Sequence, residues 1–138
     1  MPSSDEPLEI YVDRSLGQLI VPEALRGLGI AVKTEVEVFG VVPAGVPDGV
    51  WLERAGREGW VVFTKDGRIR YRVAEIGVLA VNRVKAFVLS GGNVSGAEQA
   101  QHYVRNINRI RRACRQRGPL VYSVHSRGIE RLWPKDSA

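Results

Sequence analysis

The pattern of apolar and polar positions predicts short strands separated by helices. Residues 8–12 are rich in strand formers and stop at Asp13, and residues 60–64 form an almost unbroken apolar run, as expected of a strand covered on both faces. Residues 30–39 alternate between apolar and mostly charged side chains, which predicts a strand with one wetter face near a sheet edge. Residues 78–89 are rich in β-branched side chains and predict another strand region.

Helical periodicity fills the intervals between these runs. Glycines end the first three predicted helices, which cover 18–26, 48–57 and 68–76. The longest predicted helix is basic and covers 94–117, because Ser95 and Glu98 have the spacing of a capping box and the apolar residues that follow form one stripe. Residues 120–124 and 128–133 predict a closing strand and a hairpin or edge piece.

This β-α-β-α-β-α-β order predicts an α/β fold with a mostly parallel sheet and helices on both faces. A chain of 138 residues without repeats or a linker predicts a single domain over 1–138, in which 1–7 are expected to be flexible. No run approaches the roughly 18 apolar residues of a membrane span. No signal sequence is evident, so we expect a cytoplasmic protein without a membrane partner.

The net charge of +5 is unevenly distributed, because six arginines and no acid lie between Arg105 and Arg117. Clustered guanidinium groups bind phosphates and carboxylates, so the block indicates a polyanion or an acidic protein partner. Solvated helix arginines are the simpler interpretation. The two histidines and the single cysteine have no zinc-ligand spacing, and no phosphate-binding glycine motif is present.

Three aspartates provide the strongest chemical signal. Asp13 and Asp66 follow predicted strands, and Asp48 opens a predicted helix after a proline-rich loop. Ligands of open α/β sheets collect at the carboxyl ends of strands, and carboxylates gathered there can bind a divalent metal. Taken singly, Asp48 also suits a helix N-cap and Asp66-Gly67 suits a turn.

With this trio, the run Val61-Val62-Phe63-Thr64-Lys65-Asp66 resembles the PIN-like nucleases, and in particular the VapC-type ribonuclease toxins of bacterial toxin-antitoxin pairs, including short mycobacterial members. The resemblance covers roughly residues 8–83 and implies a PIN-like three-layer domain. It implies that Asp13, Asp48 and Asp66 bind Mg²⁺ or Mn²⁺ as catalytic ligands and that Thr64 supports the third acid. The sequence departs from the pattern at Gly67-Arg68, where a second acid and an aromatic often stand. Glu75 or a water is a candidate to complete the site, and a degenerate site stays open.

The implied activity is metal-dependent endoribonuclease cleavage of RNA, in which Arg14, Lys65 and Arg68 could orient the substrate strand. Solvated surface is an equal interpretation of these three cations. The resemblance also implies a cognate antitoxin as partner, and a homodimer is possible. A noncatalytic RNA-binding or protein-interaction module is the main alternative. A phosphoacceptor receiver domain fits less well, because Thr64 and Lys65 are adjacent instead of on separate strands.

Overall fold

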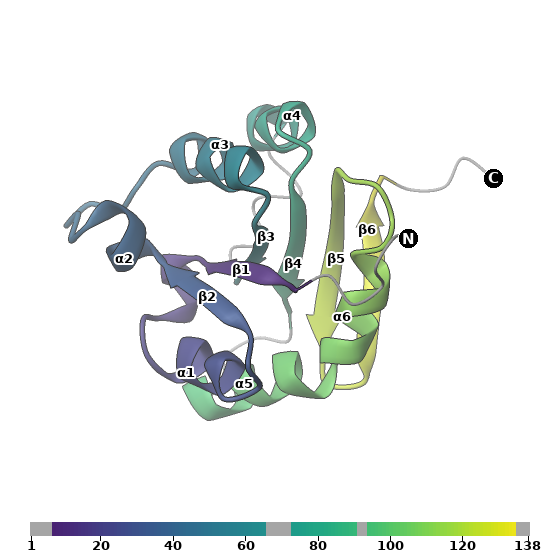
Figure 1. Ribbon diagram of the computed structural model, residues 1–138. Helices are drawn as coiled ribbons and strands as arrows, with labels where there is room; N and C mark the ends of the chain where they lie inside the picture. The colour runs from purple at the N-terminus through teal and green to yellow at the C-terminus, as the bar shows by residue number, and fades with distance from the viewer. Residues whose placement is uncertain (1–6, 66–72, 91–93, 135–138) are drawn as a thin grey trace.

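A six-stranded sheet forms the centre of the protein (Figure 1). The computed structural model describes residues 7–65, 73–90 and 94–134, without the side chains of 73–76. The elements, in chain order, are β1 (Glu9–Val12), the 3₁₀ turn η1 (Arg14–Leu16), α1 (Ile20–Arg26), β2 (Ala31–Thr34), α2 (Glu35–Phe39), α3 (Asp48–Glu58), β3 (Val61–Thr64), α4 (Val73–Val81), β4 (Lys85–Leu89), α5 (Gly96–Arg105), α6 (Ile107–Ala113), β5 (Leu120–His125) and β6 (Gly128–Trp133).

The strand order is β2-β1-β3-β4-β5-β6, and every neighbouring pair is parallel except β5 with β6. The predicted α/β fold with a mostly parallel sheet is therefore confirmed, as is the closing hairpin. Strand β2 lies at the edge, where its alternating pattern placed it. Of the expected flexible segment 1–7, residues 1–6 lie outside the described residues.

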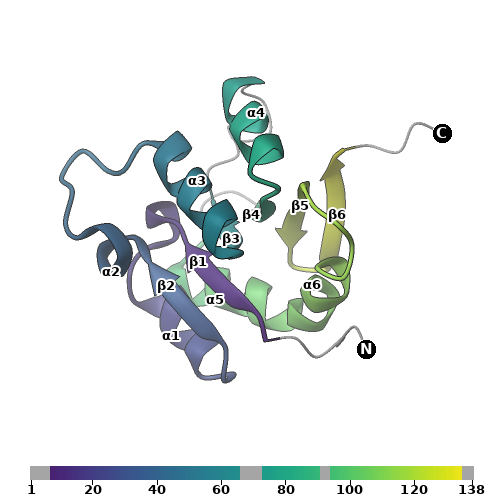
Figure 2. The same ribbon diagram turned by 45° about the horizontal axis from the view of Figure 1, so that its top comes forward.

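Two hydrophobic clusters cover the two faces of the sheet, and Figure 2 shows their helices on opposite sides. On the face covered by α1, α5 and α6, the Phe63 ring stacks on Tyr103 with centroids 4.2 Å apart. On the face covered by α3 and α4, Tyr11 stacks on Trp51 and Trp60 at 5.5 and 5.9 Å. Burial of a large apolar side chain contributes roughly 1.5–3 kcal/mol, so these layers hold the strand ends in place.

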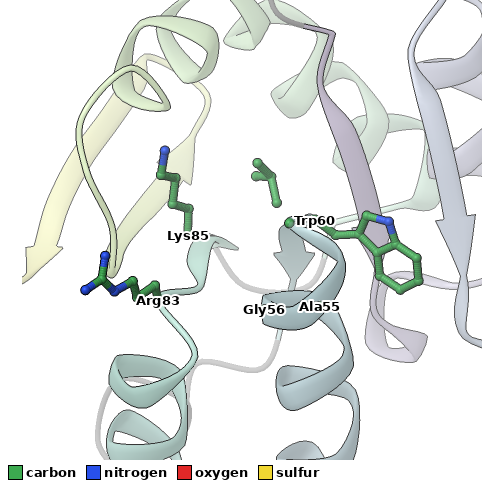
Figure 3. Close-up of a pocket in the computed structure, with 7 residues that line it drawn as sticks. Ala55, Gly56, Trp60, Arg83 and Lys85 are labelled. Atoms are coloured by element: carbon green, nitrogen blue, oxygen red, sulfur yellow. The ribbon is translucent and has the colours of Figure 1, made fainter.

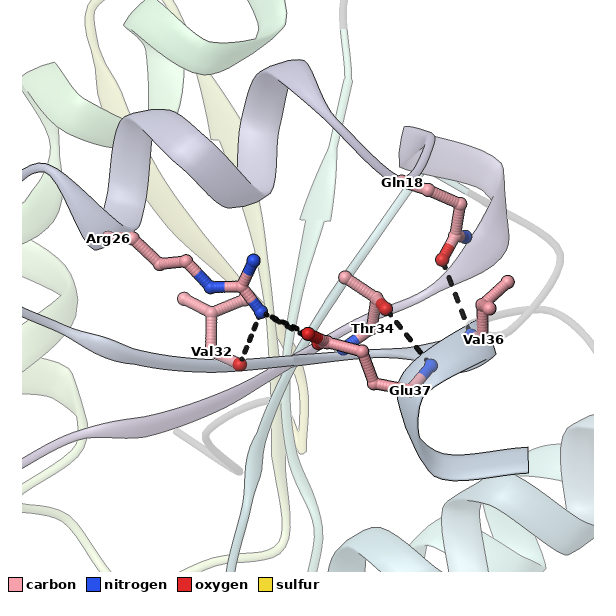
Figure 4. Close-up of polar contacts among 6 residues, drawn as sticks. All are labelled: Gln18, Arg26, Val32, Thr34, Val36 and Glu37. Atoms are coloured by element: carbon pink, nitrogen blue, oxygen red, sulfur yellow. Dashed lines mark hydrogen bonds and ion pairs between the residues drawn. The ribbon is translucent and has the colours of Figure 1, made fainter. Parts of the chain in front are cut away.

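The predicted strand over 30–39 is wrong in its second half. Strand β2 ends at Thr34, and helix α2 begins at Glu35. The Thr34 hydroxyl accepts a hydrogen bond from the Glu37 backbone N–H, and the Glu37 carboxylate accepts one from the Thr34 backbone N–H, as Figure 4 shows. This capping box satisfies backbone N–H groups at the start of the helix. The residues after Thr34 therefore form a helix, although their apolar and polar side chains still alternate.

The predicted helix over 68–76 and strand over 78–89 also need correction. Helix α4 continues through Gly77 to Val81, and only Lys85–Leu89 form the strand. The β-branched residues near the end of α4 favour a strand by propensity alone, but Leu79 is fully buried against the α3 side of the sheet. Tertiary packing therefore overrides a weak local preference.

The single basic helix predicted over 94–117 is two helices, α5 and α6, which meet at Asn106. The buried Asn106 side-chain amide donates to the carbonyls of His102 and His125, each over 2.8 Å. The second of these carbonyls belongs to β5, so a contact distant in sequence fixes the break. No helix in the described part of the chain is long and apolar enough to span a membrane.

Candidate functional site

Three parallel strands deliver polar side chains to one edge of the sheet. Val12 of β1 pairs with Thr34 of β2 and with Phe63 of β3. The residues that follow these paired positions are Asp13, Glu35 and Thr64. They therefore lie side by side at the carboxyl ends of the three strands. This is the edge where open α/β sheets bind ligands.

Asp13 is held firmly at this edge. It is 7% exposed, and its backbone N–H donates to the Phe63 carbonyl over 2.9 Å. Its Oδ2 accepts hydrogen bonds from the Ser15 hydroxyl at 2.7 Å and from the Thr64 hydroxyl at 2.8 Å. Ser15 Oγ in turn accepts the Lys65 backbone N–H over 2.9 Å. These bonds orient the carboxylate while leaving Oδ1 outside both hydroxyl contacts.

Thr64 thus supports Asp13, and its expected support of the third aspartate stays a prediction. Asp66 lies outside the described residues, as does Arg68. Ser15 was not singled out from the sequence, although it stands only two residues after Asp13 and connects that acid to the start of the segment after β3.

Glu35 is the site residue that sequence reasoning missed. The alternating pattern predicts that Glu35 lies on the solvent-facing side of a strand. In the structure it is the first residue of α2, and it is only 4% exposed. The signal that could have located it is the Thr34-x-x-Glu37 capping box, which starts a helix directly after β2. Figure 4 shows how Arg26 supports the same turn by contacting Glu37 and the Val32 carbonyl.

Asp48 begins α3 as its first helical residue and is not the N-cap, which is Pro47. Its Oδ1 accepts a hydrogen bond from the Trp51 indole N–H over 3.1 Å. An acid in the first turn also suits the helix dipole. Asp48 therefore has a local structural role, and its charge also raises the pKa of Asp13 and of Glu35.

The ionisation of Asp13 and of Glu35 is opposed by burial and by neighbouring carboxylates. Burial raises the pKa of Asp13, its two hydroxyl partners lower it in part, and the charge of Asp48 raises it. Burial and the charge of Asp13 raise the pKa of Glu35, whereas Arg14 and a hydrogen bond from the Val46 backbone lower it. Charges on neighbouring carboxylates thus act on Asp13 and on Glu35 at this edge.

The hydroxyl of Tyr11 lies among these acids. Tyr11 is fully buried, and its hydroxyl has no hydrogen-bond partner in the described part of the chain. Burial raises its pKa well above the usual range, and the charges of Glu35, Asp13 and Asp48 raise it further. An unpartnered buried hydroxyl beside several carboxylates leaves oxygen donors for a bound group.

Two of the predicted substrate-binding cations can be placed. The Arg14 Nη1 lies 3.4 Å from the Pro43 carbonyl, and a Cβ on Gly45 would come within 2.6 Å of it, so Arg14 packs on the loop before α3. Lys65 has an exposed side chain directly after β3. Glu75 lies in α4, but its side chain is outside the described part of the structure.

Oxygen donors dominate this edge, which suits a hard cation such as Mg²⁺ or Mn²⁺ better than zinc. Among the described residues, no three His, Cys, Asp or Glu side chains are close enough together to form a metal-binding group.

Comparison with known proteins agrees with this geometry. Residues 8–91 match the family described as "PIN like domain". The chain is also 33% identical over 124 residues to the Mycobacterium tuberculosis protein named "Putative ribonuclease VapC45", and the aligned region covers 89% of this chain and 90% of that protein. No solved structure matches the chain.

Proposed function

Because this chain belongs to the PIN-like domain family and is similar over most of its length to a VapC-type protein, we propose that it is a metal-dependent endoribonuclease. The observation that carries the proposal is the buried, doubly hydrogen-bonded Asp13 beside Glu35 at the carboxyl edge of a parallel sheet. Such an arrangement keeps a carboxylate oriented where RNA phosphates can approach. The proposed substrate also supports the expected cytoplasmic location.

Asp13, Asp48 and Asp66 would hold Mg²⁺ or Mn²⁺, and Glu35 beside Asp13 is a further candidate. No three of the described acids form such a group by themselves, so Asp66, which lies outside the described residues, would be needed to complete it. The donor set fits a hard cation, because it consists of carboxylate oxygens, Asp48 raises the pKa of Asp13 and of Glu35, and the Tyr11 hydroxyl is left without a partner among the described residues. When bound, such a cation supplies charge for the phosphate and lowers the pKa of a bound water. Ionised Asp13 and Glu35 are needed for this binding, so affinity should rise with pH.

The other residues of the edge would position the substrate. Arg14 is placed beside Glu35 by the loop at Pro43 and Gly45, where its guanidinium can approach a phosphate oxygen. The exposed Lys65 follows β3 at the same edge. Ser15 and Thr64 act through Asp13 by fixing its Oδ2, and they are therefore positioning residues.

The direct test is cleavage of a labelled structured RNA with Mn²⁺, Mg²⁺ or EDTA by the wild type, Asp13→Asn and Asp66→Asn. Glu53→Gln is the matched control, because Glu53 is an exposed acid of α3 that pairs with Arg57 away from this edge. Metal-dependent cleavage that only the two aspartate variants lose is the expected result. Equal cleavage by all the proteins would indicate a contaminating ribonuclease. RNA binding without cleavage would instead favour the noncatalytic module.

A toxin role with a cognate antitoxin extends the proposal. Exposed apolar side chains lie on the segments that leave the carboxyl ends of β1 and β2: Leu19, Ile20, Val36, Val41, Val42 and Val50. The Val36 backbone N–H donates to Gln18, so two of these segments are adjacent (Figure 4). Apolar residues around a polar edge suit a protein that covers it.

Growth and copurification test this role. Expression of the free protein should slow bacterial growth, and coexpression of the product of the flanking gene should restore it and copurify. Failure of the two proteins to copurify would count against the antitoxin. We refer to the sheet edge that carries Asp13 and Glu35 as the acid edge. A toxic effect that persists in Asp13→Asn would show that growth inhibition does not come from the acid edge.

A further inference from the structure

A group of cations lies at the opposite, amino end of the sheet. Arg83 and Lys85 precede or begin β4, and Arg115 and Arg117 follow α6. The Lys85 ammonium donates to the Cys114 carbonyl over 2.6 Å. A Cβ on Gly118 would lie 2.8 Å from the Arg83 carbonyl oxygen, so the two segments are in close contact. We refer to Arg83, Lys85, Arg115 and Arg117 as the basic edge.

The charges of the basic edge are not neutralised by the described acids. In the described part of the chain, the ion pairs are Arg26–Glu37, Arg54–Glu58 and Arg57–Glu53. Two acids lie nearby, but each has another partner. Glu58 pairs with Arg54, and Glu9 accepts the indole N–H of Trp60 over 3.0 Å. The basic edge is therefore available to an external anion.

A hollow adjoins two of these cations. Its volume is about 190 Å³, and it lies between the end of α3 and the start of β4, with Gly59, Trp60, Arg83 and Lys85 in its lining. Figure 3 shows Arg83 and Lys85 on one side of the hollow and Trp60 on the other. This space is several times the roughly 30 Å³ that a water occupies in the liquid, so a phosphate group can enter it.

The backbone of Arg83 gives independent support. Its φ of 56° is the only positive value recorded for a non-glycine residue in the described part of the chain. Helix ends in this conformation usually carry glycine, which adopts it at the lowest cost. The chain instead has an exposed arginine there. Strained residues of this kind concentrate at ligand sites, and the strain is consistent with a use for the guanidinium.

The basic edge and the acid edge lie at opposite ends of the same strands. Strand β4 runs from Lys85 to Leu89, a length of about 13 Å at 3.3 Å per residue. Successive nucleotides of one RNA strand rise by at least about 3.4 Å, so one or two nucleotides held at the acid edge would not reach the basic edge, whereas a folded RNA with a helical body could contact both. Arginines bind such a body through its phosphates, without reading its sequence.

We propose that the basic edge binds the phosphates of folded RNA and so favours substrates large enough to contact both edges. This inference rests on the proposed ribonuclease function. The proposal is supported by three observations: Arg115 and Arg117 are exposed, a hollow lies beside Arg83, and none of these residues forms an ion pair in the described part of the chain.

The test measures binding of a labelled RNA hairpin and a labelled dinucleotide to Asp13→Asn protein in EDTA, at several salt concentrations. The test variant adds Arg115→Gln and Arg117→Gln. Its matched control adds Lys33→Gln and Arg57→Gln, which remove two exposed positive charges elsewhere. Binding is measured without cleavage, so failure of the ribonuclease proposal leaves this test intact.

For the hairpin, loss of two phosphate contacts should lower the salt slope by roughly 1.5, because each contact contributes about 0.7–0.9. Between about 50 and 200 mM salt the parent should then lose roughly tenfold more affinity than the test variant. Binding of the dinucleotide, and binding of the hairpin to the control variant, should show no such change. Equal weakening for both RNAs, or hairpin binding with the same affinity and salt slope in the test variant and its parent, would overturn the proposal.

Arg83→Gly separates binding from folding. Glycine removes the charge and relieves the left-handed backbone, so the variant should keep or raise the melting temperature while binding the hairpin more weakly. A variant that melts higher and binds the hairpin as tightly as its parent would show that Arg83 has no part in RNA binding.

Discussion

The hydroxyl of Thr64 donates a hydrogen bond to Asp13 Oδ2 over 2.8 Å across 51 residues of sequence. This contact joins the ends of β1 and β3, and the parallel pairing of Val12 with Phe63 makes it possible. Ser15 adds a second hydroxyl to the same oxygen. The carboxylate therefore enters the proposed reaction already oriented, which lowers the cost of assembling the site.

Thr64→Val should remove this donor while keeping the shape of a fully buried side chain. The loss of a hydrogen bond to a charged group predicts a free energy of unfolding lower by about 1–3 kcal/mol. The pKa of Asp13 should rise, because the hydroxyl lowers it now, and RNA cleavage should require a higher pH. Urea unfolding and pH–rate profiles measure both effects. Thr64→Ser is the control, and an identical profile for Val and Ser would contradict the orienting role.

The raised carboxyl pKa values determine whether the free energy of unfolding rises or falls with pH. Burial raises the pKa of Asp13 above 3.8 and that of Glu35 above 4.5, so the folded protein binds more protons than the unfolded chain between the ordinary and the raised values. Stability without metal should therefore fall as the pH rises through this window. The fall should be about 1.4 kcal/mol for each tenfold difference between the acid dissociation constants of the folded and unfolded states.

Asp13→Asn tests that sign, because it removes one of the titrating groups. In EDTA, its free energy of unfolding should vary less steeply between mildly acidic and neutral pH than that of the wild type. Added Mg²⁺ should stabilise the wild type more as the pH rises. Parallel pH curves for the two proteins in EDTA would mean that Asp13 titrates alike in the folded and unfolded states.

Glu37→Ala should loosen the start of α2, where Glu35 lies. The change removes the acceptor of the Thr34 backbone N–H and the partner of Arg26. Loss of the capping contact predicts about 1 kcal/mol of destabilisation and a lower cleavage rate. Glu53→Ala, which breaks an exposed helix pair, should cost under about 0.5 kcal/mol. Comparable losses of cleavage in both variants would argue against a specific role of α2.

Asn106→Ala should destabilise the junction of α5 and α6. The side chain is fully buried and donates to two carbonyls, and Arg109 donates to its Oδ1 over 3.1 Å. Leaving these groups unpaired predicts a loss of about 1–3 kcal/mol in urea unfolding. Asn108→Ala, at an exposed position on α6, should change stability by less than about 0.5 kcal/mol. Equal stabilities of the two variants would contradict the junction role.

The sequence predicted those features that local patterns specify. The run before Asp13, the strand ending at Thr64 and the helix ended by Gly59 are confirmed. Gly59 has a φ of 76° and a ψ of 23°, the left-handed conformation that glycine adopts readily at a helix end. These local signals are enough to predict the order of strands and helices and the edge of the sheet at which Asp13 lies.

Other features depend on contacts between distant residues. The alternation that continues past Thr34 predicts a strand at Glu35, and only the capping box distinguishes the helix that begins there. The break at Asn106 depends on the His125 carbonyl of β5, which no helical period can show. Likewise, the residues through Val81 favour a strand locally but fold as a helix.

Calorimetric titration of Mn²⁺ into the RNA-free protein near neutral pH is the most direct test of a metal site built on Asp13 and Glu35. The proteins to compare are the wild type, Asp13→Asn, Glu35→Gln and the exposed control Glu53→Gln, in two buffers with different ionisation enthalpies. We predict binding with proton release by the wild type and the control, and affinity at least about tenfold weaker in the other two. Equal Mn²⁺ affinity in all four proteins would contradict a metal site built on Asp13 and Glu35.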